Sequence, residues 1–176
     1  GQVHGPLART AEDAALMLDA LVGYSRLSPI SVAPPWKSAL AEVLASGDAK
    51  GLRIAYVTDI AGIGVDTEID AICRATALSL REAGASVEEI AFDVSDGKEP
   101  YQAWRGLWMV GQQYANLDKL EEFGPNLQGN VKAGLKVTPL DFAKAEQERA
   151  KLFLRFRDFF ERFDLLLTPA SPVKQY

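Results

Sequence analysis

The apolar positions between residues 50 and 92 alternate between two strand-like runs and one helical stripe. Residues 52–57 (LRIAYV) and 86–92 (SVEEIAF) are strand-like, and residues 66–82 between them repeat apolar side chains every three or four positions. Gly84 stands where a left-handed helix end would place it. This pattern predicts a βαβ unit with a right-handed connection, and therefore an α/β fold.

Helical periodicity dominates the rest of the chain. Thr10 caps a predicted helix that ends at Gly23, and residues 24–35, which contain three prolines and no periodicity, form a connector. The remaining predicted elements are short helices over 36–44 and 126–133, a helix from Tyr101 to Leu120, a long helix capped by Thr138 and ending at Phe163, and a buried strand over 164–168.

Composition places the chain among ordinary globular proteins. Its 176 residues are 48% hydrophobic and 24% charged, with a formal net charge of −5, so we expect a single domain over residues 1–176. The mild acidity argues against nucleic acid or an anionic membrane surface as a partner. No apolar run approaches the roughly 20 residues of a membrane span. A single cysteine and the lack of a signal peptide predict a cytoplasmic protein.

The sequence is poor in the side chains that most hydrolases use. His4 is the only histidine, and no Gly-x-Ser-x-Gly elbow is present, which argues against a Ser–His–Asp triad within these residues. The same scarcity argues against a zinc site. Cys73 falls in the apolar stripe of its helix and is interpreted as a buried core cysteine.

Other polar motifs have structural interpretations. Gly62-Ile63-Gly64 follows the first strand, where a dinucleotide fingerprint would lie, but Thr67 replaces the third glycine. We interpret these glycines as a turn into the helix. The acidic pairs are interpreted as solvated faces or turns, and they are Glu88-Glu89, Asp93 with Asp96, and Glu121-Glu122.

Three aromatic residues, Tyr101, Trp104 and Trp108, fall on one face of their predicted helix. Tryptophan and tyrosine combine a large apolar body with one polar atom, so this face could line an apolar substrate channel. Core packing against the sheet produces the same spacing. The sequence leaves both interpretations open.

Five motifs in order resemble the amidase signature family. They are residues 5–15 (GPLARTAEDAA), 51–55 (GLRIA), 65–69 (VDTEI), 84–88 (GASVE) and 163–169 (FDLLLTP), and they extend over nearly the whole chain. The resemblance implies a mixed β-sheet covered by helices and an amide hydrolase that needs neither metal nor organic cofactor. It also implies a nucleophilic serine, a second serine in a cis peptide, and a lysine.

The family carries those catalytic residues in a segment of the type Gly-Gly-Ser-Ser-Gly-Gly, and this sequence contains no Gly-Gly dipeptide. The family order places that segment before Gly1, so we assign no catalytic residue here. We expect a partial amidase domain, truncated at both ends relative to the family and inactive alone. By analogy, the pocket wall for the amide substrate would include Tyr101, Trp104, Trp108 and Thr168.

Two hypotheses follow from the resemblance. In the first, the chain supplies the scaffold and pocket wall of an amidase, with the missing catalytic segment of the parent chain as its partner. In the second, it is a non-catalytic α/β binding or interaction module derived from an amidase. Both leave a homo-oligomer open, and the sequence leaves open whether the parent is a stand-alone amidase or an amidotransferase subunit.

Overall fold

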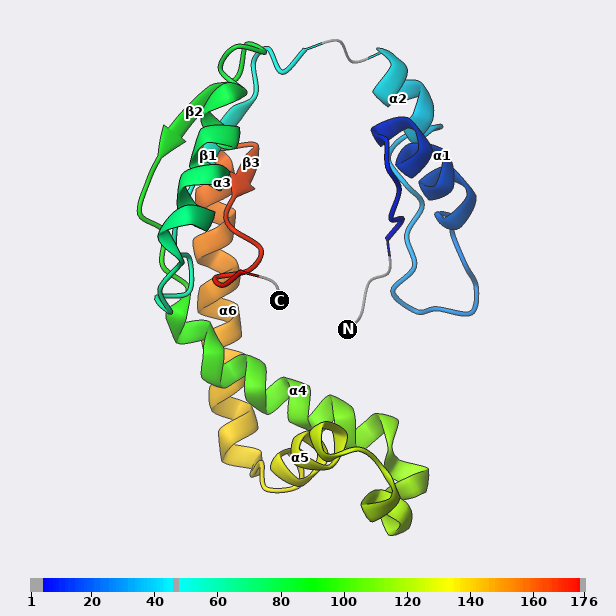
Figure 1. Ribbon diagram of the computed structural model, residues 1–176. Coiled ribbons are helices and arrows are strands. Elements are labelled where there is room, and N and C mark those ends of the chain that lie inside the picture. Colours follow the sequence, from blue (N-terminus) through cyan, green and yellow to red (C-terminus); the bar gives the residue numbers. More distant parts are fainter. Residues whose placement is uncertain (1–4, 46–47, 175–176) are drawn as a thin grey trace. The chain divides into compact units, whose positions relative to one another are not determined.

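The computed structural model describes residues 5–45 and 48–174, which belong to two compact units, residues 1–49 and residues 50–176 (Figure 1). His4 lies outside the described residues. The expectation of one partial domain over residues 1–176 stays a prediction. The first unit contains α1 (Ala11–Leu21) and α2 (Ala39–Ala45). Residues 24–35 contain neither helix nor strand, as predicted for a connector.

Both helices of the first unit are capped by side chains. The Thr10 hydroxyl accepts the Asp13 N–H at 3.1 Å, as the sequence predicts. The prediction that α2 begins at Trp36 is wrong, because the helix begins three residues later, directly after Ser38, whose hydroxyl accepts the Ala41 N–H at 3.1 Å. The Asp19 carboxylate of α1 also accepts the N–H groups of Ala39 (2.6 Å) and Leu40 (3.1 Å). These bonds, led by that of Ala39, hold the pKa of Asp19 below its ordinary value.

The second unit is built on a parallel sheet whose strand order is β2 (Ser86–Glu89), β1 (Arg53–Tyr56), β3 (Leu165–Leu167). Helix α3 (Thr67–Ser79) connects β1 to β2, which confirms the βαβ unit and the α/β class. The three strands in the described part of the chain are all parallel, whereas the family resemblance implies a mixed sheet.

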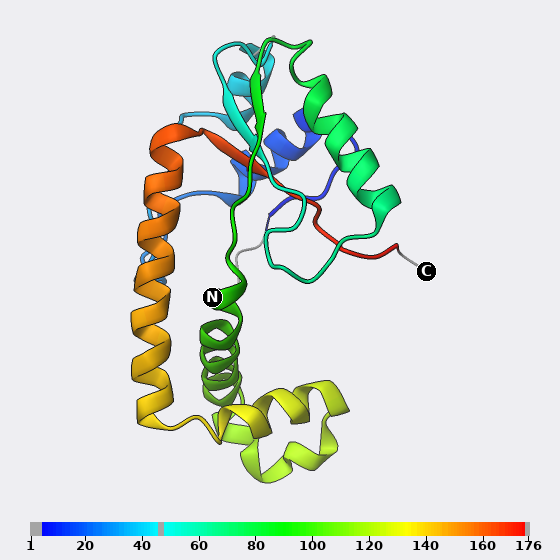
Figure 2. The ribbon, with the colours of Figure 1, turned by 90° about the vertical axis from the view of Figure 1, so that its left-hand side faces the viewer.

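Helices cover the two faces of this sheet, with α3 on one side and α6 (Pro139–Arg162) on the other (Figure 2). Successive strand residues point to opposite faces. Ala55 accordingly packs with Phe159 and Phe163 of α6, while the neighbouring Tyr56 reaches α3. The core on the α6 side is completed by Ile90, Phe92 and Leu166.

Two predictions about burial are wrong. The sequence predicts a buried β3, but Leu165 is 44% exposed, because β3 lies at one edge of the described sheet and pairs there with β1. It also predicts Cys73 in the core, but this residue is only partly buried. Its neighbour Ile72 is exposed, so the apolar stripe of α3 is wider than the face that the helix turns to the sheet.

A helical arm extends from the sheet and consists of η1 (Ser95–Gly97), α4 (Lys98–Gln112), η2 (Tyr114–Glu122) and α5 (Pro125–Gly134), with α6 beside it (Figure 2). The predicted helix through Leu120 ends at Gln112. The backbone leaves helical geometry at Asn116 and Lys119. Asparagine has a low helix propensity, and the Asn116 side chain donates to the Gln113 side chain at 3.4 Å.

Helix α6 begins with the capping box that the sequence predicts. The Thr138 hydroxyl accepts the Asp141 N–H at 3.1 Å, and the Asp141 carboxylate accepts the Thr138 N–H at 2.9 Å. Pro139 occupies the first turn, where its missing N–H costs nothing. Within residues 5–45 and 48–174, no helix is both long enough and apolar enough to cross a bilayer.

Arg53 and Asp164 join β1 to the start of β3. The Asp164 carboxylate accepts bonds from Arg53 Nη2 (2.8 Å), Arg53 Nε (3.1 Å) and the Arg53 backbone N–H (2.8 Å). The Arg53 side chain, followed by its backbone N–H, lowers the pKa of Asp164 from 3.8 to about 2. This contact therefore stabilises the fold fully above pH 4 and is lost as the pH falls through about 2.

We expect the Asp164→Asn variant to unfold at a lower urea concentration than the wild type at pH 6. The difference between the two urea midpoints should become smaller between pH 4 and pH 2. The reason is that protonation removes from the wild type the same charge that the substitution removes. Urea midpoints measured from pH 2 to pH 7 test this, and added salt should narrow the gap at pH 6 because both side chains are partly exposed. A gap independent of pH would contradict it.

Candidate functional site

The carboxyl ends of β1 and β3 lie where the chain connections diverge. From β1 the chain runs through α3 to β2 on one side, and from β2 it returns through α6 to β3 on the other side of β1. In open parallel sheets, such a switch point leaves a crevice outside the carboxyl ends of the strands, which is where ligands bind. Thr168, the residue that follows β3, lies at this edge.

The loop after β1 is organised by Asp59. Its carboxylate accepts the N–H groups of Gly64 (2.7 Å), Ile63 (3.2 Å) and Ala61 (3.3 Å), and these bonds, led by that of Gly64, lower the pKa of Asp59. Gly62 and Gly64 have φ values of 65° and 81°, which favour glycine. The interpretation of these glycines as a turn is confirmed by these φ values and by the bonds that Asp59 accepts.

The loop after β1 and the segment after β3 are bonded to each other. Val57 N–H donates to the Leu167 carbonyl at 2.9 Å where the strands end. Further along, Asp66 N–H donates to the Pro172 carbonyl at 2.9 Å, and Lys174 forms an ion pair with Glu68. We call residues 168–174 the exit segment. It is held to the first turn of α3.

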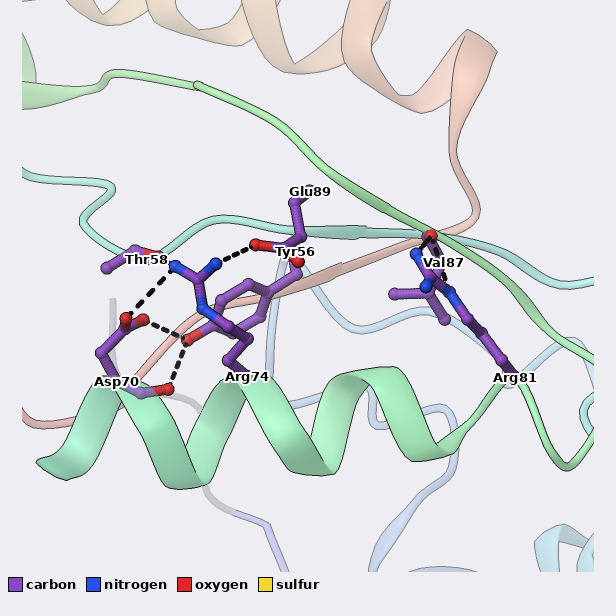
Figure 3. Close-up of polar contacts among 7 residues, drawn as sticks. All are labelled: Tyr56, Thr58, Asp70, Arg74, Arg81, Val87 and Glu89. Atoms are coloured by element: carbon purple, nitrogen blue, oxygen red, sulfur yellow. Dashed lines mark hydrogen bonds and ion pairs between the residues drawn. The ribbon is translucent and has the colours of Figure 1, made fainter.

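A polar network lies beside this edge and joins β1, α3 and β2 (Figure 3). Tyr56, only 2% exposed, donates its hydroxyl to Asp70 at 2.9 Å. Arg74 donates to Asp70 and to Thr58, both at 3.2 Å, and forms an ion pair with Glu89. Each charged group in the network faces a partner of opposite charge.

The pKa values in this network follow from those contacts. Burial, and then the hydrogen bond to Asp70, raises the pKa of Tyr56 to about 12. Burial also works to raise the pKa of Asp70, but hydrogen bonds from Tyr56 and Thr58 and the charge of Arg74 outweigh it, so this pKa is lowered. Near neutral pH the phenol stays protonated and the carboxylate stays charged. The network therefore holds the carboxyl end of β1 against α3.

Two hollows accompany these elements. One of about 410 Å³ lies at the carboxyl ends of β1 and β2, where Tyr56, Thr58, Arg74, Glu89 and Asp93 contribute to its lining. The other, of about 640 Å³, lies between η1, α4, α5 and α6. Its lining includes acidic, basic and apolar side chains, and none of the four predicted pocket residues belongs to either lining.

The three residues of the predicted aromatic face differ in how far they are buried. Trp104 is packed between α4 and α6, where its Nε1–H donates to Glu146 at 2.8 Å and its ring lies 5.0 Å from that of Phe142. Tyr101 is 60% exposed. Trp108 is partly buried on the same helix, whereas Thr168 belongs to the sheet edge. A substrate role for these four residues stays a prediction.

Sequence reasoning missed Asp59, Asp70 and Arg74 as organisers of the site. Asp59 stands just before the two glycines of its loop, and Asp70 and Arg74 have the i, i+4 spacing of a helical ion pair. The acidic pairs are indeed exposed, and several of their members have ion-pair or turn partners, such as Glu121 with Lys132. Among residues 5–45 and 48–174, no group of three or more potential metal ligands is present.

Comparisons with known proteins agree on one family. The model of the family described as Amidase matches residues 2–175. An acylamidase of Rhodococcus erythropolis is 31% identical, with 98% of this chain and 38% of the relative covered. An amidase of Pseudomonas putida is 28% identical, with 96% of this chain and 36% of the relative covered. A glutamyl-tRNA(Gln) amidotransferase chain of Rhodospirillum rubrum is also 28% identical, with 96% and 38% covered.

The fold has solved counterparts. A bacterial aryl acylamidase of the amidase signature enzymes superposes with a TM-score of 0.77 at 23% identity, covering 98% of this chain and 38% of that one. The chain thus spans about 38% of the length of these proteins. Because the family model matches nearly every residue, the chain belongs to the amidase family.

Proposed function

We propose that the protein containing these residues hydrolyses a carboxylic amide to an acid and an amine or ammonia. The observation that carries this proposal is the family match over residues 2–175. A nucleophilic serine attacks the amide carbonyl, and a lysine with a serine in a cis peptide relays the proton to the leaving amine. Backbone amides stabilise the oxyanion. These groups come from the Gly/Ser-rich segment, which is not among the 176 residues.

In this proposal residues 50–176 provide the scaffold and part of the pocket wall. Thr168 lies at the carboxyl edge of β3, the edge at which parallel sheets bind ligands. Tyr101, Trp104 and Trp108 of α4 would add an aromatic wall, and the bond from Trp104 to Glu146 fixes the orientation of that ring. Aromatic side chains favour an apolar acyl group. The similarity to an acylamidase supports an acyl amide as the substrate.

We expect the complete reading frame that encodes these residues to hydrolyse acyl anilides, and residues 1–176 alone to show no turnover. A serine-directed fluorophosphonate should label the complete protein only, because the nucleophile is outside this chain. Release of the aniline chromophore and gel fluorescence measure the two outcomes. Turnover by repurified residues 1–176, or no labelling and no hydrolysis by the complete protein, would contradict the proposal.

A further inference from the structure

The exit segment is held at both of its ends. Directly before it, the Leu167 carbonyl accepts the Val57 N–H. Five residues after Leu167, the Pro172 carbonyl accepts the Asp66 N–H. Four residues, 168–171, lie between the two anchored carbonyls. The Glu68–Lys174 ion pair adds a third attachment beyond them. The first bond fixes the end of β3, and the other two join the exit segment itself to the start of α3.

The exit segment has little freedom between these attachments. Pro169 and Pro172 each have a restricted φ angle. The Ser171 hydroxyl donates to the Val173 carbonyl at 2.8 Å and so closes a local turn. The position of Thr168 is therefore coupled to the attachments at residues 172 and 174.

The loop before α3 and the first turn of α3, to which the exit segment is attached, are fixed by hydrogen bonds of their own. Asp59 binds three amides of the loop before α3. The Asp66 carboxylate caps α3 by accepting the Glu68 N–H at 2.9 Å. Asp66 thus caps the helix with its side chain and binds the exit segment with its backbone N–H. A shift of the exit segment must break contacts with a fixed helix end.

We propose that the first turn of α3 is a latch for the exit segment, and that Glu68 is a positioning residue that sets which acyl groups the pocket accepts. The latch is defined by the Asp66–Pro172 bond and the Glu68–Lys174 pair. The selectivity part rests on the proposed amidase function, with Thr168 in the pocket wall. Glu68 touches no reacting atom, so its removal changes substrate binding rather than the chemical step.

The kinetic test uses the complete reading frame with Glu68→Gln, Lys174→Gln and the charge swap E68K/K174E. Acetyl, hexanoyl and benzoyl p-nitroanilides are the substrates. We expect each single variant to change the ratio of kcat/KM between small and bulky acyl groups by about 2- to 5-fold, which is the range that an exposed ion pair supports. The change should lie in KM, and the charge swap should return the ratio toward that of the wild type.

A matched control is Lys132→Gln, which removes an exposed ion pair with Glu121 in the helical arm. It should leave the substrate ratio unchanged. Single variants that keep the wild-type ratio, in an enzyme that hydrolyses the anilides, would overturn the selectivity role while leaving the proposed function intact. A wild type without hydrolysis would instead contradict the proposed function and the selectivity role that rests on it.

Hydrogen exchange tests the latch independently of activity. The Asp66 N–H is bonded to Pro172, so peptides containing Asp66 should exchange faster in Glu68→Gln and Lys174→Gln than in the wild type or in Lys132→Gln. Unchanged exchange at Asp66 in both single variants would overturn the latch, whatever the enzyme hydrolyses.

Discussion

Replacing Gly134 with alanine should destabilise the protein by about 3 kcal/mol. A Cβ at this position would lie 2.2 Å from the Gly106 carbonyl oxygen and 2.4 Å from its carbon. These are backbone atoms of α4, which cannot rotate away as a side chain can. The substitution therefore forces α4 and α5 apart and loosens the helical arm. Urea unfolding followed by far-UV circular dichroism measures the effect.

Gly129→Ala is the matched control for this prediction. Gly129 lies on the same helix, α5, and a Cβ there would meet no atom within 4 Å. Because glycine costs about 1 kcal/mol relative to alanine inside a helix, this variant should be slightly more stable than the wild type. Equal urea midpoints for the two variants would show that α4 and α5 do not approach each other as described.

Phe159→Ala should cost about 3–5 kcal/mol of unfolding free energy, as expected for a large aromatic side chain removed from a core. Phe159 is 5% exposed and lies at the centre of the α6–sheet core. Its ring centroid is 4.8 Å from that of Phe92 and 5.0 Å from that of Phe163. Alanine would leave a cavity between α6 and the sheet, and the unfolding midpoint in urea should fall accordingly.

Phe153→Ala tests whether this cost belongs to the buried position. Phe153 lies on the same helix but is 69% exposed, so its removal should change stability by no more than about 0.5 kcal/mol. A similar loss at both positions would mean that α6 packs by a different face.

Elements with local signals were predictable from the sequence. The capping box at Thr138 and the cap at Thr10 both use side chains three residues from their partners. Residues close in the sequence are therefore enough to identify them. The boundary of α2 was predictable only in part. Ser38, directly before Ala39, is a local cap that accepts the Ala41 N–H at 3.1 Å, but the second cap is Asp19, twenty residues before Ala39, and only folding brings these two together.

The candidate site was predictable in part. The alternation of strands and helix indicated a parallel sheet, and five motifs in order, including the one around Thr168, indicated the family. The face of α4 that carries Trp104 had two interpretations, and its bond to Glu146, 42 residues away, shows that this ring packs against α6. No spacing in the sequence relates Pro172 to Asp66, although their bond holds the exit segment.

The sequence by itself determined the elements whose capping and periodicity are local, the α/β class and the resemblance to amidases, because these depend on residues within a few turns of one another. The tertiary structure alone decided which faces are buried and which loops lie together. Burial and long-range hydrogen bonds depend on what a chain segment packs against, as Leu165 at the sheet edge and the Asp66–Pro172 bond both show.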